Sequence, residues 1–190
     1  MLLVSQNIGS YDMKLPENTV FRINMAWCNS LEELKEKLSK NRGSDFFVDL
    51  PIGRIKPPNN RYTLEDMLPI INENQNIAYF AVSNVESKND LEQFLEKLPT
   101  RVNIVPKIES PTAVKNIDEI CNALKSEKRI VMLDHDDLFS SIIRNKEDSS
   151  MFQKYIKELI DYCEENNISL LRTVGVVFSD NEMRTTQYIK

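Results

Sequence analysis

The sequence predicts an α/β domain built on a parallel sheet of about seven strands. Short apolar runs alternate with longer segments whose apolar residues recur at helical spacing, as in strands joined by crossover helices. Hydrophobic residues make up 41% of the 190 residues and charged residues 28%, which excludes a wholly disordered chain. No repeat or low-complexity linker divides the chain, so we expect one domain over residues 1–190. Seven strands fit a barrel or an open doubly wound sheet, and periodicity does not choose between them.

The first quarter of the chain predicts three strands and one helix. The apolar run 2–4 opens the sheet, and the run 20–27 supplies the second strand. Leucines recur at helical spacing over 31–38, which predicts the first helix. The run 45–50 is the third expected strand.

The next segment predicts two helices around a fourth strand. Thr63, with Asp66 three residues later, predicts the capped start of a helix over 64–72. The run 77–83 is the fourth expected strand, and 90–98 is its helix.

A proline marks each of the next two expected elements. Pro106 lies inside the fifth strand, 102–108, and must fall where the sheet needs no N–H donor. Pro111 suits the first turn of a helix whose apolar stripe continues to Leu124. The run 129–133 is the sixth expected strand.

The last part of the chain predicts the longest helix and a seventh strand. Apolar residues gather on one side of a helix over 151–165, and 168–174 is the strand. The irregular stretches 9–19, 51–62 and 138–150 are expected to be loops at the same end of the sheet.

Composition excludes several classes of function. The net charge is −5 and no basic run occurs, so we expect no nucleic-acid partner. Only four glycines are present, and neither glycine-rich nucleotide motif appears. No apolar window approaches the roughly 18 residues of a membrane span, so no membrane partner is expected. The start of the chain lacks signal-peptide features, and the three cysteines lack metal-ligand spacing, which indicates a cytoplasmic protein.

Polar residues gather at the carboxyl ends of the expected strands. Two residues at i and i+2 of a strand share a face, as Arg22 and Asn24 do, and as Lys107 and Glu109 do. Charges in a covered parallel sheet are costly unless they are paired or metal-bound, and these strand ends are where α/β folds assemble their sites. The remaining candidates are Asp49, Ser83, Asp134 to Asp137 with His135, and Thr173.

These residue types suit metal-assisted chemistry on a small anion. Glu109 and Asp137 offer hard oxygen ligands to Mg²⁺ or Mn²⁺, with Asp134 and Asp136 as competing ligands or as parts of a solvated loop or helix cap. Lys107 beside that metal could neutralise charge on an enolate or phosphoryl oxygen. Thr173 could orient a proton-carrying water, and Arg22 could hold a carboxylate or phosphate through two hydrogen bonds. The alternatives are a structural Lys107–Glu109 ion pair, and His135 as a loop residue rather than a general base.

Several segments resemble the pyruvate kinase family. Val-Pro-Lys-Ile-Glu-Ser-Pro-Thr-Ala-Val-Lys-Asn-Ile-Asp-Glu-Ile (105–120) resembles the stretch in which a catalytic lysine and a metal-binding glutamate precede a helix. The similarity is collinear over most of the chain and implies a TIM-like (β/α) barrel. The other segments that resemble motifs of this family, in order, are 7–10, 21–24, 48–56, 81–83, 130–138 and 172–173.

Carried over residue by residue, the resemblance assigns a role to each candidate. It implies Lys107 and Thr173 as catalytic residues and Glu109 and Asp137 as ligands of Mg²⁺ or Mn²⁺. The resemblance also implies phosphate, potassium or scaffold positions at Arg22, Asn24, Asp49 and Ser83. Ala26-Trp27 replaces the Ser-His that follows the arginine motif in this family, which argues against potassium and nucleotide-phosphate contacts. Asp134-His135-Asp136 replaces an Ala-Arg-Gly.

The same comparison predicts an incomplete barrel. The lid domain of the family is reduced to 54–62, and no segment corresponds to an eighth strand, so we expect about seven. An exposed parallel edge is a liability, which predicts a homodimer or a hetero-complex that covers it.

Three functions remain open on this basis. The first is a barrel that binds a divalent metal with pyruvate, phosphoenolpyruvate or a related keto acid, and has little kinase activity because it lacks the lid. The second is a metal-dependent lyase of the citrate lyase or keto-acid aldolase type, which the missing lid favours. The third is a non-catalytic module that senses a metabolite or serves as a subunit.

Overall fold

The strands of the protein form one sheet in which sequence order and spatial order agree. The computed structural model describes residues 2–5, 19–40, 43–53 and 60–172. Every neighbouring pair of strands is parallel, and the order is β1-β2-β3-β4-β5-β6-β7. A doubly wound sheet reverses its strand order part-way, whereas a (β/α) barrel does not. The strands are β1 (Leu2–Ser5), β2 (Thr19–Asn24), β3 (Asp45–Leu50), β4 (Ile77–Val82), β5 (Asn103–Ile108), β6 (Ile130–Leu133) and β7 (Ser169–Arg172).

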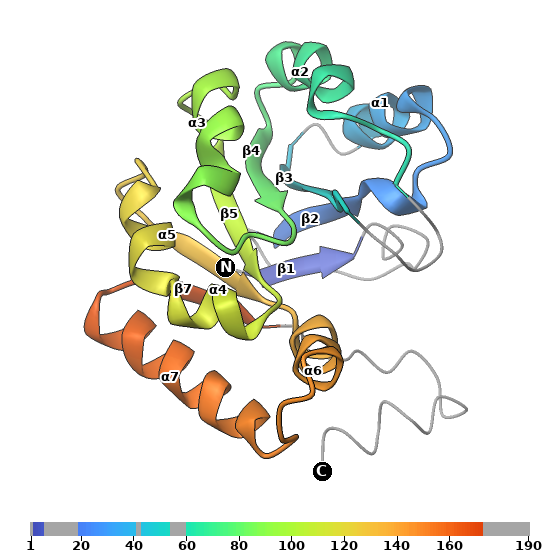
Figure 1. The fold of residues 1–190 in the computed structure, drawn as a ribbon. Coiled ribbons are helices and arrows are strands. Elements are labelled where there is room, and N and C mark those ends of the chain that lie inside the picture. Colours follow the sequence, from blue (N-terminus) through green and yellow to red (C-terminus); the bar gives the residue numbers. More distant parts are fainter. Residues whose placement is uncertain (1, 6–18, 41–42, 54–59, 173–190) are drawn as a thin grey trace.

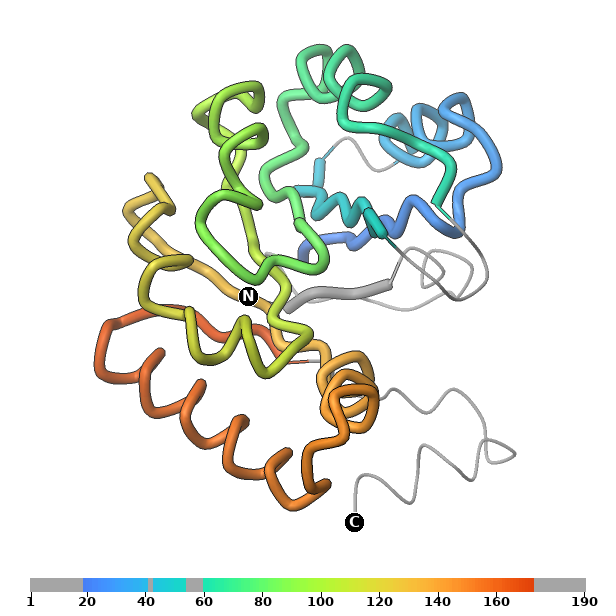
Figure 2. Tube along the Cα trace, in the orientation of Figure 1, coloured from blue at the N-terminus to red at the C-terminus, as the bar shows by residue number. Residues whose placement is uncertain are grey.

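The sheet is curled, and the crossover helices lie along its outer side in an arc (Figure 1). The strands follow one another around the curl in chain order, from β2 in blue to β7 in red (Figure 2). The protein is therefore an incomplete TIM-like barrel with seven parallel strands, as the sequence predicts. None of the described helices combines the length and apolarity that crossing a bilayer requires. The helices of the arc are α1 (Leu31–Lys40), α2 (Leu64–Glu73), α3 (Glu92–Lys97), α5 (Ile117–Ala123) and α7 (Met151–Glu165).

Local hydrogen bonds fix where two of the elements begin and end. Thr63 and Asp66 form the expected capping box of α2, with the Thr63 N–H donating to Asp66 Oδ2 over 2.8 Å. β2 ends at Asn24, short of the predicted 27, because Asn24 Oδ1 accepts the Ala26 N–H over 3.0 Å and a 3₁₀ turn, Met25–Trp27, follows. A second 3₁₀ turn, Lys88–Leu91, precedes α3.

Two predictions for helices need correction. The helix expected from Pro111 to Leu124 is divided into α4 (Pro111–Lys115) and α5, because Asn116 leaves helical geometry and donates its side-chain N–H to Glu86 O over 2.8 Å. The loop expected over 138–150 is wrong for its first half, where α6 (His135–Arg144) forms.

The sheet has two apolar faces because helices cover its outer face and the curl brings the inner side chains together. Phe46 and Val48 of β3 point outward into the large cluster shared with the helices. Phe47, between them, points inward. The inward residues form a separate small cluster, Val20, Phe47, Ala81, Val105, Ile130 and Met132. This alternation decides which polar residues meet at the end of the barrel.

Candidate functional site

The polar residues of the candidate site lie on the inner face of the sheet, next to its apolar cluster and toward the carboxyl ends of the strands. Side chains on one face of a strand recur every second residue, so the residue two positions after an inner apolar residue also points inward. Five inner residues, from β2 to β6, are followed in this way by a polar one. The pairs are Val20 and Arg22, Phe47 and Asp49, Ala81 and Ser83, Val105 and Lys107, and Met132 and Asp134.

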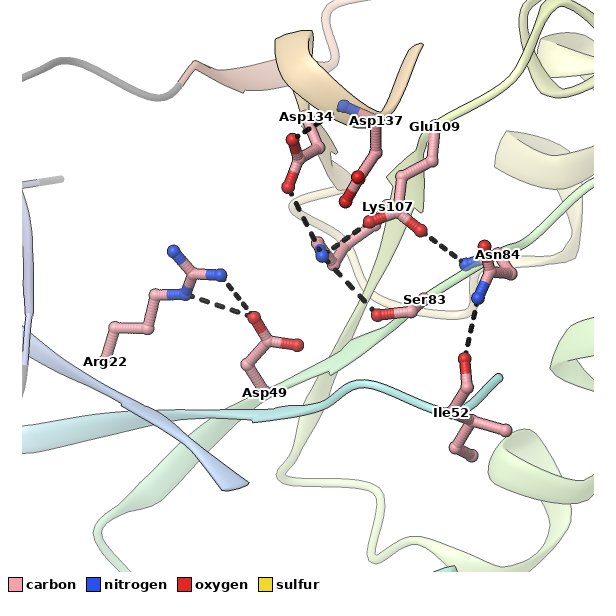
Figure 3. A network of polar contacts seen from close by, with 9 residues as sticks. All are labelled: Arg22, Asp49, Ile52, Ser83, Asn84, Lys107, Glu109, Asp134 and Asp137. Carbon is pink, nitrogen blue, oxygen red and sulfur yellow. Dashed lines mark hydrogen bonds and ion pairs between the residues drawn. The ribbon is translucent and has the colours of Figure 1, made fainter. Parts of the chain in front are cut away.

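Lys107 is the buried cation at the centre of the site (Figure 3). Its Nζ lies 2.5 Å from Glu109 Oε1 and 3.5 Å from Asp134 Oδ2, and it donates to Ser83 Oγ over 3.4 Å. Burial by itself lowers the pKa of Lys107, but the carboxylates of Asp49, Glu109 and Asp134 together outweigh burial and raise it. The lysine is therefore an ammonium at neutral pH.

Glu109 follows β5 directly and is 6% exposed. Burial raises the pKa of its carboxyl, and the neighbouring Lys107 only partly offsets that effect. The two pKa values therefore rise for different reasons: the carboxylates raise that of Lys107, and burial raises that of Glu109. Oε2 of Glu109 also accepts the backbone N–H of Asn84 over 2.7 Å, which fixes the orientation of the carboxylate.

Three carboxylates converge beside Lys107 at the ends of β5 and β6. Ligand oxygens of Glu109, Asp134 and Asp137 all lie within 4.8 Å of one another. Carboxylate oxygens are the ligands that Mg²⁺ and Mn²⁺ prefer, so the group fits such an ion.

The start of α6 explains which aspartates join this group. Asp134 caps the helix, because its Oδ1 accepts the Asp137 N–H over 3.3 Å, and its Oδ2 faces Lys107. Asp137 lies in the first turn, on the side of Glu109 (Figure 3). Asp136 is exposed and outside the group.

Arg22 and Asp49 form a second charged pair, across neighbouring strands β2 and β3. Both Nε, at 3.2 Å, and Nη2 of Arg22 donate to Asp49 Oδ2 (Figure 3). Asp49 is fully buried, and its Oδ1 has no hydrogen-bond partner among the described residues. Arg22 is thus held by Asp49. A cavity, described below, is lined in part by Lys107, and neither Arg22 nor Asp49 lines it.

The other predicted site residues lie apart from this cavity or outside the described residues. Asn24 caps the 3₁₀ turn after β2. His135 Nε2 lies 3.4 Å from Nη2 of Arg172, and burial together with Arg172 lowers the pKa of His135. Neither Asn24 nor His135 lines the cavity. Thr173 lies outside the described residues.

A cavity of about 220 Å³ opens at this end of the sheet. Its volume is below the roughly 300–1,000 Å³ typical of drug-sized ligands and suits a small metabolite. Lys107, Glu109 and Asp137 line one part of it, with Ser83 and Asn84 beside them.

Three polar or charged lining residues, Asn84, Ser140 and Arg144, were not predicted from the sequence. Asn84 has a φ of 55°, in the left-handed region that asparagine tolerates better than most residues, and its Nδ2 donates to Ile52 O over 2.6 Å. Ser140 and Arg144 also line the cavity, and both come from the helix that had been expected to be a loop. The apolar residues Leu138 and Ile142, four apart and both buried, are the signal that could have shown that helix.

Comparison with known proteins identifies the fold. No protein-family model matches the sequence, and no curated protein matches it. The structure of RipC from Yersinia pestis aligns with a TM-score of 0.61 and 14% identity, over 99% of this chain and 80% of that chain. Citrate synthase SbnG aligns with a TM-score of 0.60 and 11% identity, over 90% of this chain and 73% of that chain. At these identities the likeness is one of fold alone.

Proposed function

We propose that this protein binds Mg²⁺ or Mn²⁺ together with a small keto acid and stabilises the enolate of that acid, as a metal-dependent lyase does. The observation that carries the proposal is the convergence of Glu109, Asp134 and Asp137 beside Lys107, on a cavity of metabolite size. The likeness in fold to citrate synthase SbnG is compatible with chemistry of this kind.

Each residue has a defined role in this chemistry. A bound divalent ion supplies Lewis-acid stabilisation of negative charge on the keto oxygen. The Lys107 ammonium adds a second positive charge in a buried site, where electrostatic stabilisation is stronger than in water. Ser83 Oγ, 3.4 Å from Nζ, helps to position the ammonium, and the Asn84 N–H holds Glu109 in place.

The resemblance to pyruvate kinase supports the same metal and keto-acid site but not phosphoryl transfer. It assigns the metal to Glu109 and Asp137 and the catalytic ammonium to Lys107. In-line phosphoryl transfer also needs a held nucleotide. The cavity of about 220 Å³ suits a keto acid better than a nucleoside diphosphate.

Titration calorimetry with Mn²⁺, alone and with oxalate as a planar mimic of enolpyruvate, tests the binding site. Asp137→Asn removes a proposed ligand without changing side-chain size, and Asp136→Asn is the matched control one residue away on the exposed side of α6. We expect Asp137→Asn to weaken Mn²⁺ binding at least tenfold and Asp136→Asn to change it less than twofold. Equal effects of the two variants would contradict the assigned ligands.

Exchange of the pyruvate methyl protons with deuterium tests enolate formation without knowledge of the second substrate. We expect exchange that depends on both protein and metal, followed by NMR, and its loss in Lys107→Met. Binding of metal and pyruvate with no exchange above the rate of metal alone would favour the non-catalytic, metabolite-sensing alternative.

A further inference from the structure

One side of α6 forms a wall of the cavity. Asp137, Ser140 and Arg144 all line it, at positions i, i+3 and i+7 of the helix. Residues at this spacing lie on one face of an α-helix, and seven residues span about 10 Å along its axis. The wall therefore has a carboxylate in the first turn, a hydroxyl in the middle and a guanidinium in the last turn.

Arg144 differs from the arginines that stabilise the fold. Arg22 is held by Asp49, and Arg101 donates to the backbone carbonyls of Ile71 and Ile77. Arg144 makes no hydrogen bond or ion pair with any residue in the described part of the chain. Arg144 is exposed, and because it lines the cavity its donors can reach a ligand there.

The position of Arg144 on the helix is compatible with such a role. Long side chains on an α-helix generally lean toward its N-terminus, which in α6 is the end that carries Asp137. The guanidinium presents donors in a planar fork that matches a carboxylate or phosphate. Ser140, between the two ends, adds a hydroxyl on the same face.

We propose that Arg144 binds a second anionic group at the far end of the keto acid, so that the ligand is an α-keto acid with an anionic tail rather than pyruvate. This inference rests on the proposed function, because it places the keto-acid end at Glu109, Asp134 and Asp137. Lys107 and a bound divalent ion then meet the keto-acid end, and Arg144 meets the tail, which makes the cavity selective for length and charge.

The test compares two ligands that differ only in the tail. 2-Oxoglutarate and 2-oxopentanoate have five carbons each, and only the first has a terminal carboxylate. With Mn²⁺ present, we expect calorimetry to show at least tenfold tighter binding of 2-oxoglutarate by the unchanged protein, the range of a charge-assisted hydrogen bond. 2-Oxo-4-phosphonobutanoate, with a phosphonate tail, then shows whether a phosphate-like group is preferred over a carboxylate.

Variants of Arg144 connect the preference to this side chain. Arg144→Gln is expected to remove the preference for 2-oxoglutarate and to leave 2-oxopentanoate binding unchanged, and Arg144→Lys is expected to restore part of it. Lys154→Gln on α7 removes a positive charge that does not line the cavity, and it is expected to preserve the preference.

The outcomes separate the two proposals. Unchanged protein that binds pyruvate and 2-oxoglutarate equally, or an Arg144→Gln variant that weakens both five-carbon ligands alike, overturns the role of Arg144 and leaves the proposed function standing. Unchanged protein that binds neither Mn²⁺ nor any of these keto acids overturns the proposed function, and this inference with it.

Discussion

Lys107 Nζ lies 2.5 Å from Glu109 Oε1, and both side chains are almost completely buried. The ammonium therefore neutralises a carboxylate that is also a proposed metal ligand. Removing one partner of a buried ion pair leaves the other charge uncompensated. The resulting loss of folding stability exceeds the net stabilisation that the intact pair provides.

Lys107→Met is expected to destabilise the metal-free protein by about 3–5 kcal/mol, because Glu109 and Asp134 lose their counter-ion. Urea unfolding measures the change, and added Mn²⁺ is expected to recover more stability in the variant than in the unchanged protein. Lys157→Met, which breaks an exposed pair with Asp161 on α7, serves as the control and is expected to cost less than about 1 kcal/mol. Similar losses in the two variants would mean that Lys107 is not the counter-ion of this group.

Asn84 connects backbone conformation to the orientation of Glu109. Its φ of 55° suits glycine and strains alanine, so Asn84→Ala is expected to be about 1 kcal/mol less stable than Asn84→Gly. Both variants lose the side-chain bond to Ile52, so the difference between them isolates the backbone. We also expect weaker Mn²⁺ binding in Asn84→Ala than in Asn84→Gly, because a shifted residue 84 no longer donates to Glu109. Equal stability and equal binding would contradict this role.

The Arg22–Asp49 pair is expected to be a structural element of the sheet. Arg22→Met leaves the fully buried Asp49 without its counter-ion and is expected to cost about 3 kcal/mol or more. The double variant Arg22→Met/Asp49→Leu removes both charges and is expected to be more stable than Arg22→Met. A double-mutant cycle in urea measures the coupling, and additive effects would show that the pair contributes nothing as a pair.

The buried thiols predict how stability depends on alkaline pH. Burial raises the pKa of Cys121 from 9.0 to about 12, so above pH 9 the native state keeps a proton that the unfolded state releases. The native state then binds more protons, and the free energy of unfolding falls as pH rises, by up to about 1.4 kcal/mol per pH unit for one thiol.

Cys121→Ala isolates this contribution, because the other titrating groups are common to both proteins. Its stability between pH 8 and 10.5 is expected to fall less steeply than that of the unchanged protein, in urea unfolding at each pH. Parallel curves would show that Cys121 does not contribute to the pH dependence.

The sequence was sufficient for the fold because its signals are local and repeated. Alternating strands and helices predicted a parallel sheet, and the period of two predicted that Lys107 and Glu109 share a face. The choice of a barrel over an open sheet came from the family resemblance, since strand order is a tertiary property. The partner expected over the open edge stays a prediction.

The site was less predictable because its geometry depends on turns. Glu109 and Asp137 were predicted as metal ligands from their residue type and their position after a strand. Whether Asp134 joins them depends on how α6 starts. A capping aspartate uses one oxygen for the helix and leaves the other for the site, and no periodicity shows this. Arg144 was missed because one more helix was needed to bring it to the cavity.

The gathering of polar residues at the carboxyl ends of the inner face also has a consequence for folding. The carboxylates, the ammonium and the guanidinium come from distant parts of the chain, and only lateral pairing of successive strands brings them together. Contacts between strands that are separated by a helix in the sequence are non-local, and non-local contacts form slowly during folding. During refolding, the ability to bind a ligand would then appear late, after the strands have paired, and would report the complete fold rather than a partly folded state.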